Sequence, residues 1–178
     1  MKISIRIASK RDLKDYTDLL QRTYQVAYTD EKIGLTKERF SKEVFATPHT
    51  QSYLKSNLVV NDKQKTWLAF LDSNLVGSIT ITDKSEECEL RGFYVTPQYQ
   101  GKGIGKKLWN LVLDFAGDKD IVLDLYSHNR KTIEMYKKWG FKIDKQKGVF
   151  YRHWPEWPED LKAKSLHMRF SSKRSQHF

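Results

Sequence analysis

The sequence has almost no cysteine and no long apolar run. Cys88 is the only cysteine among 178 residues, which rules out an internal disulfide and a zinc site built from cysteines. The apolar runs are only a few residues long, whereas a membrane-spanning helix needs roughly 20. The first residues, MKISIRIASK, alternate as in a strand and lack the apolar core of a signal peptide. We therefore expect a cytoplasmic protein with no metal and no membrane partner.

Acidic residues are in the minority. The 22 Asp and Glu residues stand against 32 Lys and Arg, which gives a formal net charge of +10. Such an excess can serve nucleic acid, anionic metabolites or solubility alone, so charge does not decide the function. A chain of 178 residues with 39% hydrophobic residues suits one globular domain and is too short for two. We expect a domain at 1–170 and a basic, flexible tail at 171–178.

Apolar spacing predicts the α/β (α+β) fold class, with a mixed sheet flanked by helices. Ser9 suits a helix N-cap, and Leu13, Tyr16 and Leu20 follow it at helical spacing. The expected elements, in order, are a strand at 3–7, helices at 9–28 and 36–45, strands at 66–71, 74–83 and 88–95, a helix from about 103 to 115, a strand at 120–126, a helix at 129–140, and strands at 141–154 and 163–170.

The stretch RGFYVTPQYQGKGIGKKL, residues 91–108, begins like the strand signature of RNA-recognition domains. Arg91-Gly92-Phe93 fits that signature. Tyr94 then stands where a small residue is required, and Val95 stands where an aromatic residue is required. Pro97 ends the strand before another stacking residue can be placed. Nucleic acid is therefore not expected as a partner of this strand.

The second half of the same stretch places three glycines and several lysines between a strand and a helix, a pattern that predicts an anion site. Backbone N–H groups at a helix N-terminus have no intrahelical partner, and the helix dipole favours negative charge there. A nucleotide-binding Walker loop requires Ser or Thr at Lys107, and a dinucleotide fingerprint requires Gly at Lys106. Both motifs fail, which leaves a main-chain pyrophosphate site or a glycine-rich turn without a ligand.

The pattern Gln100-x-x-Gly103-x-Gly105, followed by LDLYSHNRKTIEMYKKWGF with Asn129 and Tyr136, resembles the GNAT superfamily of acyl-CoA-dependent N-acyltransferases. The resemblance implies one domain with a mainly antiparallel mixed sheet, and acetyl-CoA as cosubstrate. The amides of residues 100–106 would hold the pyrophosphate, and the main chain of the FYV strand and Asn129 would contact the pantetheine arm. The implied cofactor-binding residues are Phe93, Tyr94, Val95, Gln100, Gly101, Lys102, Gly103, Ile104, Gly105, Lys106 and Asn129.

Acetyl transfer to an amine needs a neutral amine and a stabilised leaving thiolate. An amine with a pKa near ~10.4 is neutral in roughly one molecule in 2,500 at pH 7, so a base or a water chain is expected. The resemblance assigns this proton relay to Glu89, whose alternative is an exposed strand carboxylate; His128 is the second candidate, or an ordinary loop histidine. It also implies that Tyr136 is the general acid facing the sulfur, although helical spacing allows a core aromatic.

The sequence indicates the acceptor site less clearly than the cofactor site. Aromatic residues from the N-terminal helices and from the loop at 155–160 can line its site, or can simply pack within the domain: Tyr24, Tyr28, Phe40, Trp154 and Trp157. Acidic residues that can attract a cationic amine, or lie solvated at the surface, are Asp30, Glu31, Glu156, Glu159 and Asp160. The candidate acceptors are a polyamine, an aminoglycoside-like amine and a protein N-terminus, and the sequence does not rank them. It also leaves open whether the protein forms a homodimer. The alternative function is a catalytically silent module that binds CoA, RNA or protein.

Overall fold

The computed structural model describes residues 2–172, so most of the tail expected at 171–178, from residue 173 on, lies outside the described residues. Strands of one sheet run in the order β1-β2-β3-β4-β5-β8-β6, and β7 also pairs with β8. The strand bounds are β1 (Ile3–Ile7), β2 (Gln64–Leu71), β3 (Asn74–Asp83), β4 (Glu87–Val95), β5 (Asp120–Tyr126), β6 (Lys142–Ile143), β7 (Val149–Arg152) and β8 (Ala163–Phe170). The β4–β5 pair is parallel and the other pairs are antiparallel, which confirms the predicted fold class.

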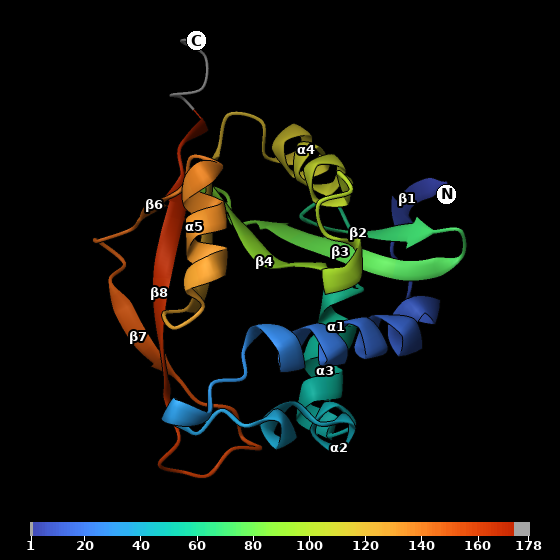
Figure 1. Cartoon of the computed structure of the whole chain (residues 1–178). Coiled ribbons are helices and arrows are strands. Elements are labelled where there is room, and N and C mark those ends of the chain that lie inside the picture. Colours follow the sequence, from blue (N-terminus) through green and yellow to red (C-terminus); the bar gives the residue numbers. More distant parts are fainter. Residues whose placement is uncertain (1, 173–178) are drawn as a thin grey trace.

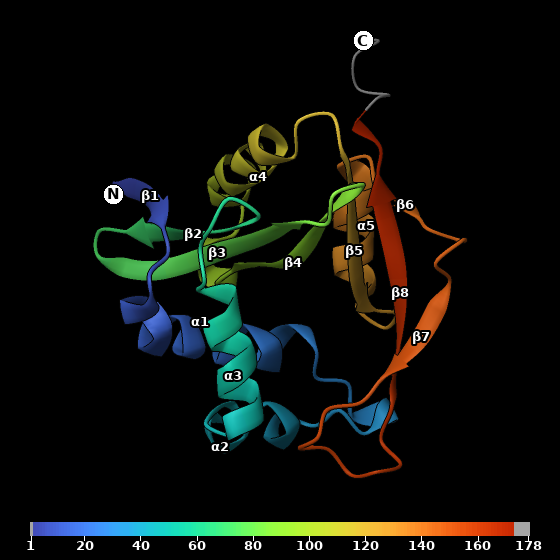
Figure 2. The same ribbon diagram turned by 180° about the vertical axis from the view of Figure 1, so that it is seen from behind.

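Helices cover both faces of the sheet (Figures 1 and 2). Their bounds are α1 (Leu13–Ala27), α2 (Lys42–Phe45), α3 (Pro48–Asn57), α4 (Ile104–Ala116) and α5 (Arg130–Lys138). Two apolar cores result, one between the sheet and α4 with α5, and one between the sheet and α1 to α3. Ile104, Leu108 and Val112 of α4 are buried in the first core, and Tyr16, Leu20 and other α1 residues are buried in the second.

The structure corrects the sequence prediction in two places. The helix expected at 36–45 is a 3₁₀ helix at Lys37–Phe40 followed by the single turn of α2, and the helix α3 was missed. Pro48 was interpreted as a stop, whereas it occupies the first turn of α3 behind a Thr47 cap, where its missing N–H costs nothing. The strand expected at 141–154 is split into β6 and β7, because the chain turns at Gly148 with φ of 67°.

The sheet opens between β4 and β5. These parallel strands pair over only three positions, with Glu87, Cys88 and Glu89 opposite Asp120, Ile121 and Val122. Beyond this vertex the strands separate, as Figure 2 shows. Within residues 2–172, every helix is too short or too polar to cross a bilayer.

Candidate active site

A cavity of about 700 Å³ fills the gap between the separated halves of β4 and β5. Its walls come from the end of α1, from β4, from the loop before α4, and from β5 and α5. Ten of the residues predicted to bind the cofactor or to act on it line this cavity: Phe93, Tyr94, Val95, Gln100, Gly101, Gly103, Gly105, Lys106, Asn129 and Tyr136. Met135 of α5 and Trp139, which caps the C-terminus of α5, also line it and were not predicted. The structure therefore brings the two sequence motifs together at one site.

The main chain of β4 offers unpaired groups to this cavity. The Thr96 N–H donates to the Val76 carbonyl oxygen on β3 at 2.9 Å. Because backbone groups alternate sides along a strand, those of Phe93 and Val95 point away from β3 and toward the gap. The Val95 carbonyl oxygen already accepts a hydrogen bond from Gln100 Nε2 at 3.0 Å. An extended ligand in the gap can therefore pair with β4 as an additional strand does.

The glycine-rich loop presents free amides at the start of α4. Gly101 and Gly103 have φ of 76° and 79°, and no atom lies within 4 Å of a Cβ built on either one. In the described part of the chain, the N–H groups of residues 101–106 donate to no protein acceptor, whereas the Gln100 N–H donates to the Pro97 carbonyl oxygen at 3.2 Å. The free N–H groups therefore begin at Gly101, one residue later than the predicted start at Gln100. Positive φ at two glycines and unpartnered amides form an anion-binding concavity.

Two predicted cofactor residues lie beside the cavity without lining it. The Ile104 side chain is buried in the core, so only its main chain can face a ligand. The Lys102 ammonium lies 5.2 Å from the centre of the Tyr99 ring, and the Lys102 side chain is exposed. Gly105 approaches the strand closely, since a Cβ there would lie 3.2 Å from Phe93 Cζ. The third glycine thus allows α4 to pack against β4.

Helix α5 supplies Asn129 and Tyr136. Asn129 caps the helix, with its Oδ1 accepting from the Thr132 N–H at 3.3 Å, which leaves its Nδ2 free to donate. The Tyr136 ring packs on Phe141 with centroids 5.1 Å apart, and its hydroxyl has no hydrogen-bond partner among residues 2–172. Burial raises the pKa of the Tyr136 hydroxyl far above its ordinary value. Tyr136 therefore stays protonated and can donate a hydrogen bond into the cavity.

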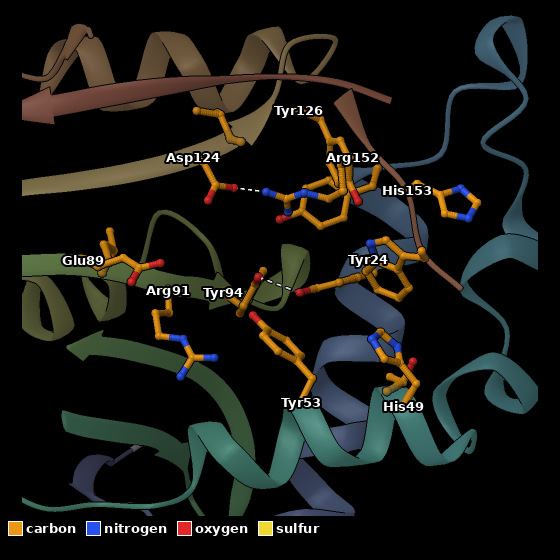
Figure 3. A pocket seen from close by; sticks show the side chains of 15 residues that line it. Tyr24, His49, Tyr53, Glu89, Arg91, Tyr94, Asp124, Tyr126, Arg152 and His153 are labelled. Carbon is orange, nitrogen blue, oxygen red and sulfur yellow. Dashed lines mark hydrogen bonds and ion pairs between the residues drawn. The ribbon is translucent and has the colours of Figure 1, made fainter. Parts of the chain in front are cut away.

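A second cavity of about 350 Å³ adjoins the first and shares lining residues with it (Figure 3). Tyr24, Tyr28 and Trp154 line it as predicted, while the predicted wall residues Phe40 and Trp157 are buried behind the wall. Residues of α3, of β7 and of the position just after β7 that were not predicted complete the wall: His49, Thr50, Tyr53, Arg152 and His153. The charged residues contributed by β4 and β5 are Glu89, Arg91 and Asp124. This cavity is the candidate acceptor site.

A β-bulge in β4 decides which side chains reach the second cavity. Thr80 of β3 is opposite Gly92, but Ile81 is opposite Leu90, so Arg91 is the extra residue. Leu90 and Phe93 consequently face the same core, three positions apart, and Tyr94 joins the opposite core. Without the bulge, period-two alternation would place Leu90 and Tyr94 on one face. No local sequence pattern marked this shift.

The acidic residues predicted near the acceptor do not line its cavity. Glu156 binds instead to the start of α3, where its Oε1 accepts from Thr47 Oγ1 at 2.6 Å and lies 3.4 Å from His49 Nδ1. This carboxylate holds the loop at 155–160 against α3, and Trp154 and Trp157 stack in that loop with centroids 5.5 Å apart. Asp30, Glu31, Glu159 and Asp160 also lie outside the cavity lining. The acidic side chains at this cavity are Glu89 and Asp124.

Of the two predicted bases, only Glu89 lines a described cavity. Its Oε2 lies 3.2 Å from the ammonium of Lys84, which is itself half exposed. His128 lies in the turn before α5, and its Nε2 is 3.1 Å from the Tyr28 carbonyl oxygen. With Nε2 engaged there and Nδ1 buried, His128 has a structural role in holding α1 to this turn.

Comparisons with known proteins identify the family. The sequence model described as "Acetyltransferase (GNAT) family" matches residues 13–141. Spermidine N(1)-acetyltransferase of Thermoplasma acidophilum is 31% identical, with 83% of this chain and 93% of that protein covered. An uncharacterized N-acetyltransferase of Methanocaldococcus jannaschii is 28% identical over 78% of this chain, which spans only 60% of that protein.

One solved structure shares the fold of this chain and a quarter of its aligned residues. The PaiA N-acetyltransferase of Thermoplasma acidophilum, in complex with coenzyme A, superposes with a TM-score of 0.61 at 25% identity, over 96% of this chain and 99% of that chain. The free amides and the open strand edge described above fit such a cosubstrate. The chain therefore belongs to the GNAT family and is an N-acetyltransferase whose cosubstrate is acetyl-CoA.

Proposed function

We propose that the acceptor is a primary amine that enters the smaller cavity and attacks the thioester directly, while both substrates are bound. The observation that carries this proposal is the junction of the two cavities, which share Tyr28, Leu90, Arg91, Tyr94, Asp124 and Leu125. Cys88, the only thiol of the chain, is buried and lines neither cavity, so it is not placed to form an acyl-enzyme. Direct transfer is the reaction that this layout supports.

Glu89 is the proposed acceptor of the amine proton, through water. Holding an amine with a pKa near ~10.4 in its neutral form at pH 7 costs about 4.6 kcal/mol without help. Glu89 lies on β4 at the last pair before the strands separate, and its carboxylate faces the smaller cavity in Figure 3. The ammonium of Lys84 lies 3.2 Å from this carboxylate and leaves room for water, because both side chains are partly exposed.

Tyr136 is the proposed donor to the departing sulfur. The amine nitrogen forms a bond to the acetyl carbon, the carbon–sulfur bond breaks, and its electron pair stays on sulfur. Because burial raises the pKa of Tyr136, its hydroxyl stabilises the thiolate by donating a hydrogen bond and keeps its own proton. Solvent then supplies the proton that completes the thiol. The acetyl oxygen can accept from a β4 amide such as that of Phe93 or Val95.

The acceptor is proposed to be a small molecule, because a cavity of about 350 Å³ matches ordinary small-ligand sites. Free amides, an unpartnered Tyr136 hydroxyl and an adjoining second cavity support turnover over a silent binding module. A cytoplasmic location is part of the same proposal and rests on the single free cysteine, which suits a reducing compartment.

The test uses the full chain with acetyl-CoA and a panel of primary amines, recording free thiol and product mass. Acetyl-CoA at 100 times its dissociation constant should stabilise the fold by about 2.7 kcal/mol, and ATP and NAD should not, since the loop lacks their motifs. Thiol release with an acetylated amine as product supports the proposal. Stabilisation by acetyl-CoA without turnover of any amine would favour the silent binding module instead.

A further inference from the structure

Arg91 brings a positive charge to the acceptor cavity without a carboxylate to balance it. Its Nη1 donates to Gln64 Oε1 at 3.0 Å, its Nη2 donates to Ser56 Oγ at 3.4 Å, and both acceptors are neutral. The guanidinium also lies 5.5 Å from the centre of the Tyr53 ring. Among residues 2–172, no Asp or Glu oxygen lies within 4 Å of Arg91. A guanidinium has five N–H donors, so further donors are available to a ligand.

The other charges of this cavity are already paired or have a task. Arg152 forms an ion pair with Asp124 and lies over the Tyr126 ring at 5.1 Å (Figure 3). Glu89 carries the proposed proton relay and has Lys84 beside it. His49 is near Glu156, and His153 Nδ1 lies 3.0 Å from the Leu161 carbonyl oxygen. Arg91 is therefore the unmatched charge among the described lining residues.

Arg91 lies two residues after Glu89 on β4 and therefore faces the same side of the sheet, and the bulge at Arg91 brings Tyr94 to that side as well. Arg91 points toward α3, where it contacts Ser56 and Tyr53, and Figure 3 shows the Glu89 and Arg91 side chains coming from β4 at one end of the cavity. A negative group and a positive group thus stand two residues apart. A ligand that carries an amine and an anionic group at its two ends would meet a charge of opposite sign at each.

We propose that the acceptor is a small aminocarboxylate, whose carboxylate binds Arg91 while its amine faces Glu89. This inference rests on the proposed function and narrows its substrate class. A planar carboxylate suits the paired N–H groups of a guanidinium and gives a charge-assisted hydrogen bond. The carboxylate takes no part in the bond changes; it positions the nitrogen that forms the bond to the acetyl carbon. A polyamine would place a second cation near Arg91, where like charges repel.

The experiment compares amines that differ only in one carboxylate: lysine with cadaverine, ornithine with putrescine, and tyrosine with tyramine. Steady-state kcat/KM is measured with saturating acetyl-CoA, and mass spectrometry confirms the acetylated product. We expect the carboxylate-bearing member of at least one pair to react at least tenfold better. In a thermal-shift assay with coenzyme A present, the same member should raise the melting temperature more than its decarboxylated partner does.

Variants of Arg91 connect the preference to this side chain. Arg91→Gln should bring the kcat/KM ratio within the preferred pair toward one, and Arg91→Lys should retain part of it because the charge is kept. Arg22→Gln, the same change at an exposed residue of α1, should leave the ratio unaltered. The melting temperature and the acetyl-CoA dissociation constant of each variant show whether it is folded and loaded. An unchanged ratio in folded Arg91→Gln would overturn the inference.

Failure of this inference can be told apart from failure of the proposed function. Turnover of cadaverine, putrescine and tyramine at rates equal to or above those of their partners overturns the aminocarboxylate assignment and keeps the enzyme. If other primary amines are acetylated but neither member of any pair is, the aminocarboxylate assignment is likewise overturned and the enzyme activity is kept. If acetyl-CoA binds but no amine of any kind causes thiol release, the proposed function and this inference are overturned together.

Discussion

The phenolic oxygens of Tyr24 and Tyr94 lie 2.9 Å apart and share a hydrogen bond between α1 and β4. Tyr24 lines the acceptor cavity, and Tyr94 lines both cavities at their junction. Burial raises the pKa of each hydroxyl well above its ordinary value, so both stay protonated. A Cβ at the neighbouring Gly92 would lie 2.7 Å from the Tyr94 ring, so that glycine makes room for the ring. This contact fixes the position of α1 above the junction.

Removing either oxygen of this pair should destabilise the protein. Tyr24→Phe or Tyr94→Phe leaves one buried hydroxyl without its partner, which costs about 1–3 kcal/mol. The double variant leaves none unpaired, so its loss should be smaller than the sum of the single losses. Urea unfolding of the four proteins measures this. Strictly additive losses would mean that the hydrogen bond contributes nothing.

Gly103 and Gly148 make a matched pair for testing the anion loop. Both have positive φ, 79° and 67°, and open space at the Cβ position, but only Gly103 lines the cofactor cavity. Alanine at either position should cost about 1–2 kcal/mol of stability through the left-handed backbone. Only Gly103→Ala should also weaken acetyl-CoA binding, because its methyl group reaches the amide concavity. Equal acetyl-CoA dissociation constants in the two variants would show that this loop does not bind the pyrophosphate.

Tyr136→Phe removes the hydroxyl and keeps the ring that packs on Phe141. Stability and acetyl-CoA affinity should change little, while the chemical step should slow by roughly 10- to 1,000-fold, in the range of acid–base groups. The measurement is a single-turnover rate with an acceptor already identified, since slow product release can hide the defect. Tyr151→Phe, on the exposed side of β7, serves as the control. An unaltered rate would make Tyr136 a core aromatic.

Asp12 should give a pH-dependent contribution to stability. The Arg6 side chain, which hydrogen-bonds to it, lowers the Asp12 pKa to about 2, and the Ser9 N–H donates to the same carboxylate at 2.8 Å. A carboxyl with a depressed folded pKa stabilises the protein above the unfolded pKa near ~3.9, and this contribution is lost as the pH falls toward the folded value. Asp12→Asn should therefore cost about 1–2 kcal/mol at pH 7 and progressively less between about pH 4 and 2.

Unfolding in urea across this pH range measures the difference between the two proteins. Asp18→Asn, on the exposed face of α1, is the control and should show no comparable trend. A loss in Asp12→Asn that stays constant down to about pH 2 would contradict the assigned cause.

Sequence patterns identified the parts of the site that act through the main chain or through one helix. Glycines mark the anion loop because a backbone that must approach a ligand excludes side chains, and Asn129 and Tyr136 lie on a single short helix. The acceptor cavity was only half predicted. Tyr94 faces this cavity through the bulge, and Asp124 and Arg152 meet there through the pairing of β5 and β7 with β8; neither feature leaves a local pattern.

Helix α3 shows a different cause of failure. The signal was present, since Thr47 followed by Pro48 is a favoured helix start, but the proline was interpreted as the end of the preceding helix. The omission mattered for the site, because α3 supplies His49 and Tyr53 to the acceptor cavity.

The strand β8 has a consequence for the order in which the site forms during synthesis. β5, β6 and β7 all pair with β8, so one half of the sheet depends on the segment Ala163–Phe170. β1 to β4, by contrast, pair with their neighbours in sequence order, apart from the long return from β1 to β2. A ribosome makes the segment of β8 after all of its partners. Arg152 is opposite Ala163 and Asp124 is opposite His167, so the wall that carries them can assemble only after this part of β8 has been made. A chain stopped before Ala163 leaves three strands without their shared partner.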